Sequence, residues 1–463
     1  MKVTKIITFL AGWLITAASV FAQGEYVSDW ASVDRRPVPQ WFTDAKFGIF
    51  IHWGVYSVPA WGPLYKDGAK GIYECYSEHY WNRLATKHPL FIKHHQAMYG
   101  ESFQYQDFVH DFKCELFDPD EWAELFREAG AKYVVLTSKH HDGYALWPSE
   151  YAWNWNAVDV GPHRDLLGDL TAAVKKTGLH MGYYYSLLEW FNPLYKNDPD
   201  TYVTQHMIPQ MKELVTKYEP DIVWPDGEWD YTSDRLRSTD FLAWLYNESP
   251  VKETVAVNDR WGKETRSRHG GFYTTEYDLV HSDNVKDKRI YHPWEECRGI
   301  GHSFGYNRNE NLDDYSSSEE LIHLLVGKVA MGGNLLLNVG PTADGRIPVI
   351  MQQRLSDMGK WLRVNGEAIY STKPWDVASG NAAISACYTT KGNDLYVIFT
   401  KYPTGAVTIE GVPRKPASAG VLGSTAKVSC SHSGKKLTVR PPALTVGTAP
   451  CDYAWVIKLT DCL

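Results

Sequence analysis

The chain has 463 residues, which is too long for one hydrophobic core and long enough for a large catalytic domain followed by a small one. Hydrophobic residues make up 44% and charged residues 22%, a balance typical of folded proteins that excludes a disordered chain. The formal net charge of −8 argues against nucleic acid or an anionic membrane surface as a partner.

The N-terminal segment, residues 1–22, has the pattern of a secretory signal peptide. Lys2 and Lys5 form a basic region, residues 6–20 are largely apolar, and the small residue Ala22 precedes Gln23. A membrane anchor is the alternative, although the apolar stretch is short for a membrane span. There is no cysteine near Gln23, so the segment does not have the pattern of a bacterial lipoprotein signal. We therefore expect export across the inner membrane to the periplasm, with a mature chain that begins near Gln23.

Strand and helix signals alternate between residues 47 and 364. Strands are expected at 47–51, 133–137, 180–185, 221–224, 255–257 and 334–339. Helices are expected at 118–129, 169–177, 203–218, 241–246, 317–331 and 352–364. Asp118 is a candidate N-cap for the first of these helices, and Ser317 with Glu320 forms a candidate capping box. The repeated units predict a (β/α)8-like barrel over residues 23–370, with an open doubly wound sheet as the alternative.

The pattern changes after Tyr370, where short β-rich runs are separated by Gly, Pro, Ser and Asn. The runs lie at 395–400, 407–409, 437–440 and 454–459. They predict an all-β sandwich domain over residues 371–463. The seven cysteines include no CxxC pair, so a structural zinc site has little support. Export permits disulfides among the four C-terminal cysteines, and the sequence does not say whether they form.

Chemically capable side chains follow the predicted strands, where a barrel places its active site. These residues are His52, His140, His141, Tyr184, Asp226 and Arg260. A catalytic metal, a Ser/His/Asp nucleophile and a carboxylate-pair glycosidase are the three enzymatic interpretations. Adjacent histidines on a strand point to opposite faces, and no HxH or HExxH pattern is present. A single histidine is most often structural, but three at strand ends favour a function, with no metal and no cofactor expected.

Long segments resemble one known family over almost the whole mature chain. They are FGIFIHWG, AKYVVLTSKHHDGYALW, GYYYSLLEWFN, DIVWPDGEW, VNDRWG, GIGHSFGYNRNE and GGNLLLNVGPTADG. Their sequence and order resemble glycoside hydrolase family 29, the retaining α-L-fucosidases, and a bacterial member in particular. The resemblance implies a barrel followed by a β-sandwich. It also implies exo-hydrolysis of terminal α-L-fucosides on fucosylated oligosaccharides or glycoconjugates.

The resemblance also implies roles for particular residues. Asp226 matches the family's nucleophile, which forms a covalent fucosyl-enzyme. The residues that match the fucose pocket are His52, His140, His141, Tyr184, Trp224, Arg260 and Phe304. The match does not separate Tyr184 from its neighbour Tyr185. Phe304 and Trp224 are expected to cradle the C6 methyl of fucose, whose burial is worth roughly 0.8 kcal/mol.

Two glutamates match positions proposed for the general acid/base. Glu276, in FYTTEYD, resembles the segment that carries the acid in bacterial members and is ranked first. Glu295, in HPWEEC, matches animal members and is ranked second, with a structural carboxylate as its alternative role. The chain departs from the family between Trp61 and Tyr80, where extra residues lead to Glu78 and His79 in place of the family's Glu-Trp pair. Both are included among the substrate-binding candidates.

Two other functions share these features. A non-catalytic fucose-binding lectin on the same fold would lack the nucleophile or the acid. An exo-enzyme for α-L-galactosides would need a roomier or more polar pocket near the C6 methyl.

Overall fold

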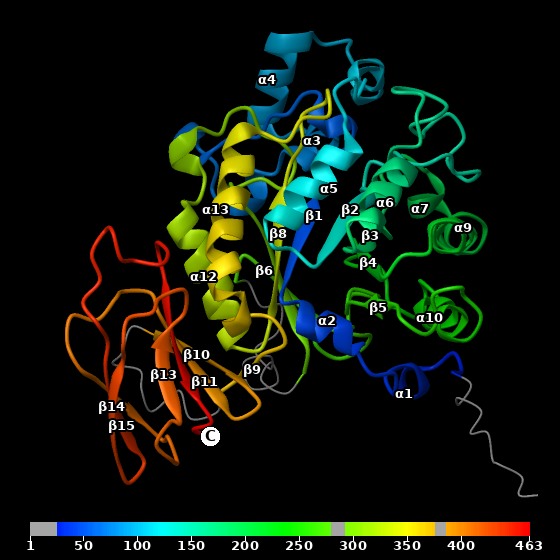
Figure 1. Cartoon of the computed structure of the whole chain (residues 1–463). Coiled ribbons are helices and arrows are strands. Elements are labelled where there is room, and N and C mark those ends of the chain that lie inside the picture. The colour runs from blue at the N-terminus through cyan, green and yellow to red at the C-terminus, as the bar shows by residue number, and fades with distance from the viewer. Residues whose placement is uncertain (1–25, 279–291, 376–385) are drawn as a thin grey trace, which may run out of the picture.

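The computed structural model describes residues 26–278, 292–375 and 386–463 (Figure 1). The predicted signal peptide lies outside the described residues. Within them, no helix is long and apolar enough to cross a membrane.

Eight parallel strands form one sheet. They are β1 (Phe47–Ile51), β2 (Tyr133–Lys139), β3 (His180–Ser186), β4 (Ile222–Asp226), β5 (Ala256–Val257), β6 (Tyr273–Glu276), β7 (Trp294–Gly299) and β8 (Asn334–Val339). Their order is β5-β4-β3-β2-β1-β8-β7-β6, which is the cyclic order of a barrel and has no switch point. A parallel bridge between Asn258 and Phe272 joins the two edges of the sheet. The barrel prediction is confirmed, and the open-sheet alternative is wrong.

Helices surround this sheet (Figure 1). They are α1 (Trp30–Val33), α2 (Gln40–Ala45), α3 (Tyr80–Ala85), α4 (Pro89–Tyr99), α5 (Pro119–Glu128), α6 (Leu166–Lys176), α7 (Leu194–Asn197), α8 (Pro199–Tyr202), α9 (Ile208–Tyr218), α10 (Ser238–Asn247), α12 (Ser318–Ala330) and α13 (Val349–Asn365). Both predicted caps form: Asp118 accepts a hydrogen bond from the backbone of Glu121, and Ser317 and Glu320 cap each other's backbone groups.

The strands divide the core into an inner and an outer layer, because successive side chains point to opposite faces. Phe50, Tyr184 and Trp224 belong to the cluster inside the barrel. Ile49 and Ile51 belong to the larger cluster between strands and helices. The strand residues at the carboxyl end of the inner layer therefore surround one space.

The C-terminal part contains two antiparallel sheets. The first has the order β13-β16-β11-β10-β9 and the second β12-β15-β14. Their strands are β9 (Lys373–Pro374), β10 (Ala386–Lys391), β11 (Asp394–Phe399), β12 (Val407–Glu410), β13 (Ser418–Val421), β14 (Ser429–Ser433), β15 (Lys436–Arg440) and β16 (Trp455–Thr460). Helix α12 contacts both β8 and β10, so it lies between the barrel and this β-sandwich. All seven cysteines, each within the described ranges, are unpaired.

Candidate active site

A cavity of about 370 Å³ opens at the carboxyl end of the barrel strands. It is lined by Phe50, His52, Tyr73, Tyr76, Glu78, His79, His140, His141, Tyr184, Trp224, Asp226, Trp229, Arg260, Arg266, Glu276, Cys297 and Phe304. Every predicted site residue except Glu295 is in this set. Tyr184 lies in the inner layer, whereas Tyr185 belongs to the outer cluster. The fold thus brings together predicted site residues that are up to 252 positions apart, from His52 to Phe304.

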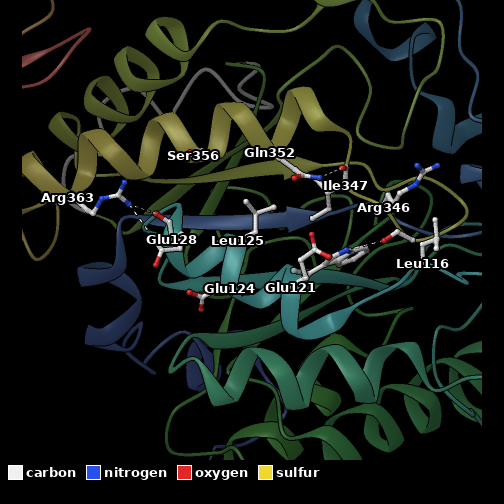
Figure 2. A pocket seen from close by; sticks show the side chains of 12 residues that line it. Leu116, Glu121, Glu124, Leu125, Glu128, Arg346, Ile347, Gln352, Ser356 and Arg363 are labelled. Atoms are coloured by element: carbon white, nitrogen blue, oxygen red, sulfur yellow. Dashed lines mark hydrogen bonds and ion pairs between the residues drawn. The ribbon is translucent and has the colours of Figure 1, made fainter.

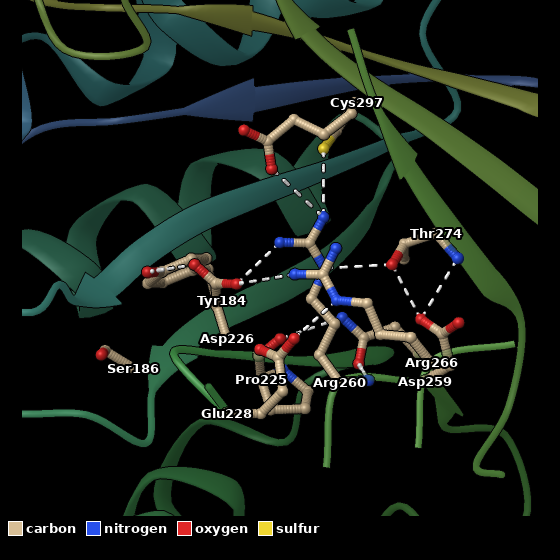
Figure 3. Close-up of polar contacts among 12 residues, drawn as sticks. Tyr184, Ser186, Pro225, Asp226, Glu228, Asp259, Arg260, Arg266, Thr274 and Cys297 are labelled. Atoms are coloured by element: carbon tan, nitrogen blue, oxygen red, sulfur yellow. Dashed lines mark hydrogen bonds and ion pairs between the residues drawn. The ribbon is translucent and has the colours of Figure 1, made fainter. Parts of the chain in front are cut away.

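Asp226 is the last residue of β4 and points into the cavity. Its Oδ1 accepts a hydrogen bond from Arg260 Nη1 at 2.7 Å, and its Oδ2 accepts one from the Tyr184 hydroxyl at 2.9 Å (Figure 3). Burial opposes ionisation of this carboxyl, but the Arg260 guanidinium outweighs it and holds the pKa of Asp226 well below its usual range. Asp226 is therefore an ionised carboxylate, as a nucleophile requires.

Arg260 is fixed on three sides. Its guanidinium stacks 4.4 Å from the centre of the Trp224 ring, and its Nε donates to Thr274 Oγ1 at 3.0 Å. Thr274 in turn donates to Asp259 at 2.7 Å (Figure 3). The remaining nitrogen, Nη2, lies 3.5 Å from Glu276 Oε2. One rigid guanidinium thus holds two carboxylates in the same cavity.

Glu276 ends β6, across Arg260 from Asp226. Its Oε1 accepts a hydrogen bond from the Tyr76 hydroxyl at 2.8 Å. The side chain is 13% exposed, so it is sheltered yet open to the cavity.

Glu295 lies outside this cavity, beneath the Trp224 indole. Its Oε1 accepts from Trp224 Nε1 at 2.9 Å and its Oε2 from the Tyr133 hydroxyl at 2.5 Å. Burial raises the pKa of Glu295 to about 7. Since both oxygens already accept hydrogen bonds and Glu295 is buried and does not line the cavity, this geometry fits a positioning residue for the indole.

Two histidines face the cavity with defined tautomers. Asn338 donates to a backbone carbonyl, so its Oδ1 is the acceptor for His52 Nδ1 at 2.7 Å. Ser186 likewise donates to a carbonyl and accepts from His141 Nδ1 at 2.5 Å. Burial lowers the pKa of His52 to about 3 and that of His141 to about 4, so both rings are neutral with Nε2 available as an acceptor. Burial also lowers the pKa of His140, whose Nδ1 has no hydrogen-bond partner within the described part of the chain.

Glu78 and His79 reach the cavity from a short 3-10 turn, Ser77–His79. Glu78 Oε2 accepts from the backbone of Gly305 at 2.9 Å and from Ser303 Oγ at 3.1 Å. Burial raises the pKa of Glu78 to about 7. The His79 ring lies 5.5 Å from that of His141, so the departure from the family pattern places an imidazole in the cavity wall.

The cavity also contains residues that the sequence did not single out: Phe50, Tyr73, Tyr76, Trp229, Arg266 and Cys297. Phe50 lies within the quoted motif FGIFIHWG and Trp229 ends the quoted motif DIVWPDGEW, so both could have been found by their distance from His52 and Asp226 along the chain. Arg266 pairs with Glu228 at 2.5 Å, and its Nη2 lies 3.9 Å from Asp226. No local pattern marks the other four residues, because long-range packing turns them toward the cavity.

A second hollow, of about 420 Å³, lies between α5 and α13 on the outside of the barrel (Figure 2). Glu121, Glu124 and Glu128 line it from α5, and Arg363 lines it from α13. It contains none of the predicted site residues and shares no lining residue with the cavity around Asp226. Its larger volume therefore does not make it the candidate active site.

Within the described ranges, no group of three or more His, Cys, Asp or Glu side chains is placed to hold a metal ion. The cavity instead combines paired carboxylates, neutral imidazoles and aromatic rings. A pair of carboxylates in a cavity at the carboxyl end of a barrel is an arrangement typical of glycoside hydrolases.

Comparisons with known proteins identify the family. A family model described as Alpha-L-fucosidase matches residues 13–367, and one described as Alpha-L-fucosidase C-terminal domain matches residues 381–460. The human tissue α-L-fucosidase is 44% identical over 445 residues, covering 94% of this chain and 92% of that protein. The α-L-fucosidase of Dictyostelium discoideum is 42% identical over 473 residues, covering 97% and 98%.

Comparison with solved structures leads to the same family. The crystal structure of Thermotoga maritima α-fucosidase has a TM-score of 0.78 at 39% identity and covers 94% of this chain and 100% of that chain. The chain therefore belongs to the α-L-fucosidases of glycoside hydrolase family 29, and it is a glycoside hydrolase. Because relatives come from mammals, an amoeba and bacteria, the comparisons do not single out a bacterial origin.

Proposed function

We propose that the chain is an exo-acting, retaining α-L-fucosidase that removes terminal L-fucose through a covalent fucosyl-enzyme on Asp226. The observation that carries this proposal is the pair of carboxylates, Asp226 and Glu276, held by the single guanidinium of Arg260 in one cavity. The cavity is lined by many aromatic rings and polar side chains, which fits recognition of a terminal sugar unit.

The first half-reaction assigns one task to each carboxylate. Asp226 attacks the anomeric carbon, and the bond from that carbon to the leaving oxygen breaks while Glu276 donates its proton to that oxygen. In the second half, Glu276 takes a proton from water, whose oxygen attacks the anomeric carbon and releases Asp226. Retention follows from the two inversions. Arg260 and Tyr184 position Asp226 throughout.

Recognition of fucose then depends on the neutral histidines. The Nε2 atoms of His52 and His141 accept hydrogen bonds from sugar hydroxyls, and Arg260 donates to others. Phe304, whose ring lies 4.8 Å from that of His52, offers an apolar surface for the C6 methyl. This apolar surface favours a fucoside over an α-L-galactoside, which carries a C6 hydroxyl; hydrolysis rates on the two aryl glycosides test the choice.

The nucleophile is tested by Asp226→Ala, assayed on an aryl α-L-fucoside. We expect turnover to fall by several orders of magnitude, while Asp230→Asn, an exposed carboxylate in the same loop, stays near wild type. NMR of the wild-type reaction should show the α-anomer of fucose first. If the β-anomer is released first, the mechanism is inverting. A lectin on this fold would give no turnover at all.

The acid/base assignment to Glu276 rests on its open position in the cavity, and Glu295 is the alternative. Glu276→Ala should slow fucosides with poor leaving groups far more than activated aryl fucosides, and azide should rescue the latter as fucosyl azide. Glu295→Ala should slow both substrates alike because it releases Trp224. If Glu295→Ala shows the leaving-group dependence and Glu276→Ala does not, the two roles are reversed.

We further propose that this is an exported bacterial enzyme of the periplasm. The support is the basic, then apolar, then small-residue pattern of residues 1–22. Native protein should begin near Gln23 on N-terminal sequencing. Retention of Met1 would contradict export through cleavage of this segment.

A further inference from the structure

Tyr73 is an aromatic residue of the cavity that the fucose-binding roles leave unused. We propose that its ring is the platform of an aglycone subsite, on which the pyranose ring that carries the fucose stacks. This inference rests on the proposed function and extends it to the leaving group. It makes the preferred substrate class fucosylated oligosaccharides rather than simple alkyl fucosides.

The segment that carries Tyr73 is built by two 3-10 turns, Ile72–Glu74 and Ser77–His79. It is held in place at Tyr73 itself, whose backbone carbonyl accepts a hydrogen bond from Arg83 Nη2 at 2.7 Å. The Tyr73 side chain lines the cavity, yet the residue is 42% exposed. It therefore lies at the mouth of the cavity, on an anchored backbone, with ring surface free for a ligand.

Aromatic contacts connect this ring to the general acid. Tyr73 packs edge-on against Tyr76, with ring centres 5.5 Å apart, and the Tyr76 hydroxyl donates to Glu276 at 2.8 Å. Tyr76 also packs edge-on against Phe304, at 5.4 Å, deeper in the cavity. The three rings, Phe304, Tyr76 and Tyr73, thus run from the cavity wall past Glu276 to solvent.

The position of the general acid indicates on which side of the cavity mouth the aglycone binds. Glu276 must protonate the oxygen that links fucose to the next sugar, so that sugar lies on the Glu276 side. In a retaining enzyme the leaving group also departs from the face opposite the nucleophile. Tyr73 is the exposed ring beside Glu276. The flat ring suits the apolar C–H face of a pyranose, and its hydroxyl offers a polar edge.

A second exposed ring at the mouth provides a matched control. Trp229 is 44% exposed and lines the same cavity, but it follows Asp226 by three residues and lies 5.1 Å from the His141 ring. It is therefore on the nucleophile's side. If mere exposure at the mouth decided aglycone binding, the larger Trp229 would matter more than Tyr73.

The test compares kcat/KM for two substrates that share the fucosyl group. In a panel of α-L-fucosyl disaccharides the leaving group is a pyranose, whereas in α-L-fucosyl fluoride it is a fluoride ion and no second sugar is present. We expect Tyr73→Ala to lower the disaccharide-to-fluoride ratio about tenfold, the scale of one lost aromatic stacking contact. Tyr73→Phe should keep the ratio near wild type. Trp229→Ala should lower both rates without lowering the ratio.

Inhibition by the free aglycone sugar gives a second readout. Its inhibition constant against fluoride hydrolysis should rise for Tyr73→Ala and stay unchanged for Tyr73→Phe. An unchanged ratio in Tyr73→Ala, or a ratio that falls in Trp229→Ala instead, would overturn the subsite assignment. Failure of the wild type to hydrolyse the fluoride at all would instead overturn the proposed function.

Discussion

Glu189 and Lys139 form an ion pair in the interior, behind the paired histidines. Lys139 ends β2 directly before His140 and is fully buried, and its Nζ donates to Glu189 Oε2 at 2.7 Å. His206 Nε2 lies 3.0 Å from the same oxygen. We predict that Glu189→Leu destabilises the protein by about 3–5 kcal/mol, because it leaves the Lys139 charge buried without a partner.

The pKa values show the size and the sign of this effect. Burial alone would raise the pKa of Glu189, but Lys139 and the His206 hydrogen bond bring it from 4.5 down to about 2. At about 1.4 kcal/mol per pKa unit, this corresponds to about 3 kcal/mol. The pKa of Lys139 is itself lowered, because the effect of burial is larger than the attraction of Glu189. The intact pair therefore stabilises the protein by less than the pKa shift of Glu189 alone indicates. The cost of breaking the pair is nevertheless large.

The direction of the pH dependence follows from the linkage between proton binding and folding. Since the folded pKa of Glu189 is lowered, its contribution is complete above pH 4.5 and is lost as the pH falls toward 2. The free energy of unfolding, measured in urea at pH 7, 5, 4 and 3, should therefore decrease as the pH falls. The decrease should be smaller for Glu189→Leu than for the wild type. Glu189→Gln, which keeps an acceptor for Lys139, should fall between the two.

An exposed ion pair of similar length is the control. Arg127 and Glu124 on α5 approach to 2.5 Å but are about half exposed. Solvent screening makes such a pair worth little, so Glu124→Gln should leave the free energy of unfolding unchanged within error. If Glu189→Leu is no less stable than Glu124→Gln, the argument from burial is wrong.

Three further outcomes follow from the same structure. Arg260→Gln should move the acidic limb of the kcat/KM profile to higher pH, because burial then raises the pKa of Asp226; an unmoved limb would show that Arg260 does not control its ionisation. Ser317→Ala should lower the free energy of unfolding by about 1 kcal/mol and speed amide hydrogen exchange at the start of α12. Unchanged exchange would mean that the capping box of Ser317 with Glu320 contributes nothing to stability. Dialysis against a strong chelator should leave aryl fucoside hydrolysis unchanged, and restoration of a lost rate by zinc would refute this.

The strand pattern shows how far local signals reach. The strongly apolar strands β1, β2, β3, β4 and β8 were predicted to within a few residues, because both of their faces are buried. β7 was missed as a strand, because Trp294–Gly299 contains two glutamates and an arginine. Those glutamates are tolerated only because Tyr133, Trp224 and Thr275 provide partners from elsewhere in the fold.

The sequence by itself determined the barrel, the β-rich C-terminal part and most of the cavity, since strand ends in a barrel converge and motifs such as VWPDGEW mark them. The tertiary structure decided what no local pattern encodes. It placed Glu276 in the cavity and Glu295 beneath Trp224, although both are glutamates on neighbouring strands. It also turned Tyr73 and Tyr76, in a stretch that looked only like extra residues, toward the acid. The physical reason is that burial, charge pairing and hydrogen bonding at these glutamates depend on distant partners. The hydrogen bonds of Glu276 with Tyr76 and of Glu295 with Trp224 and Tyr133 join residues 71 to 200 positions apart, whose approach is fixed only when the barrel closes.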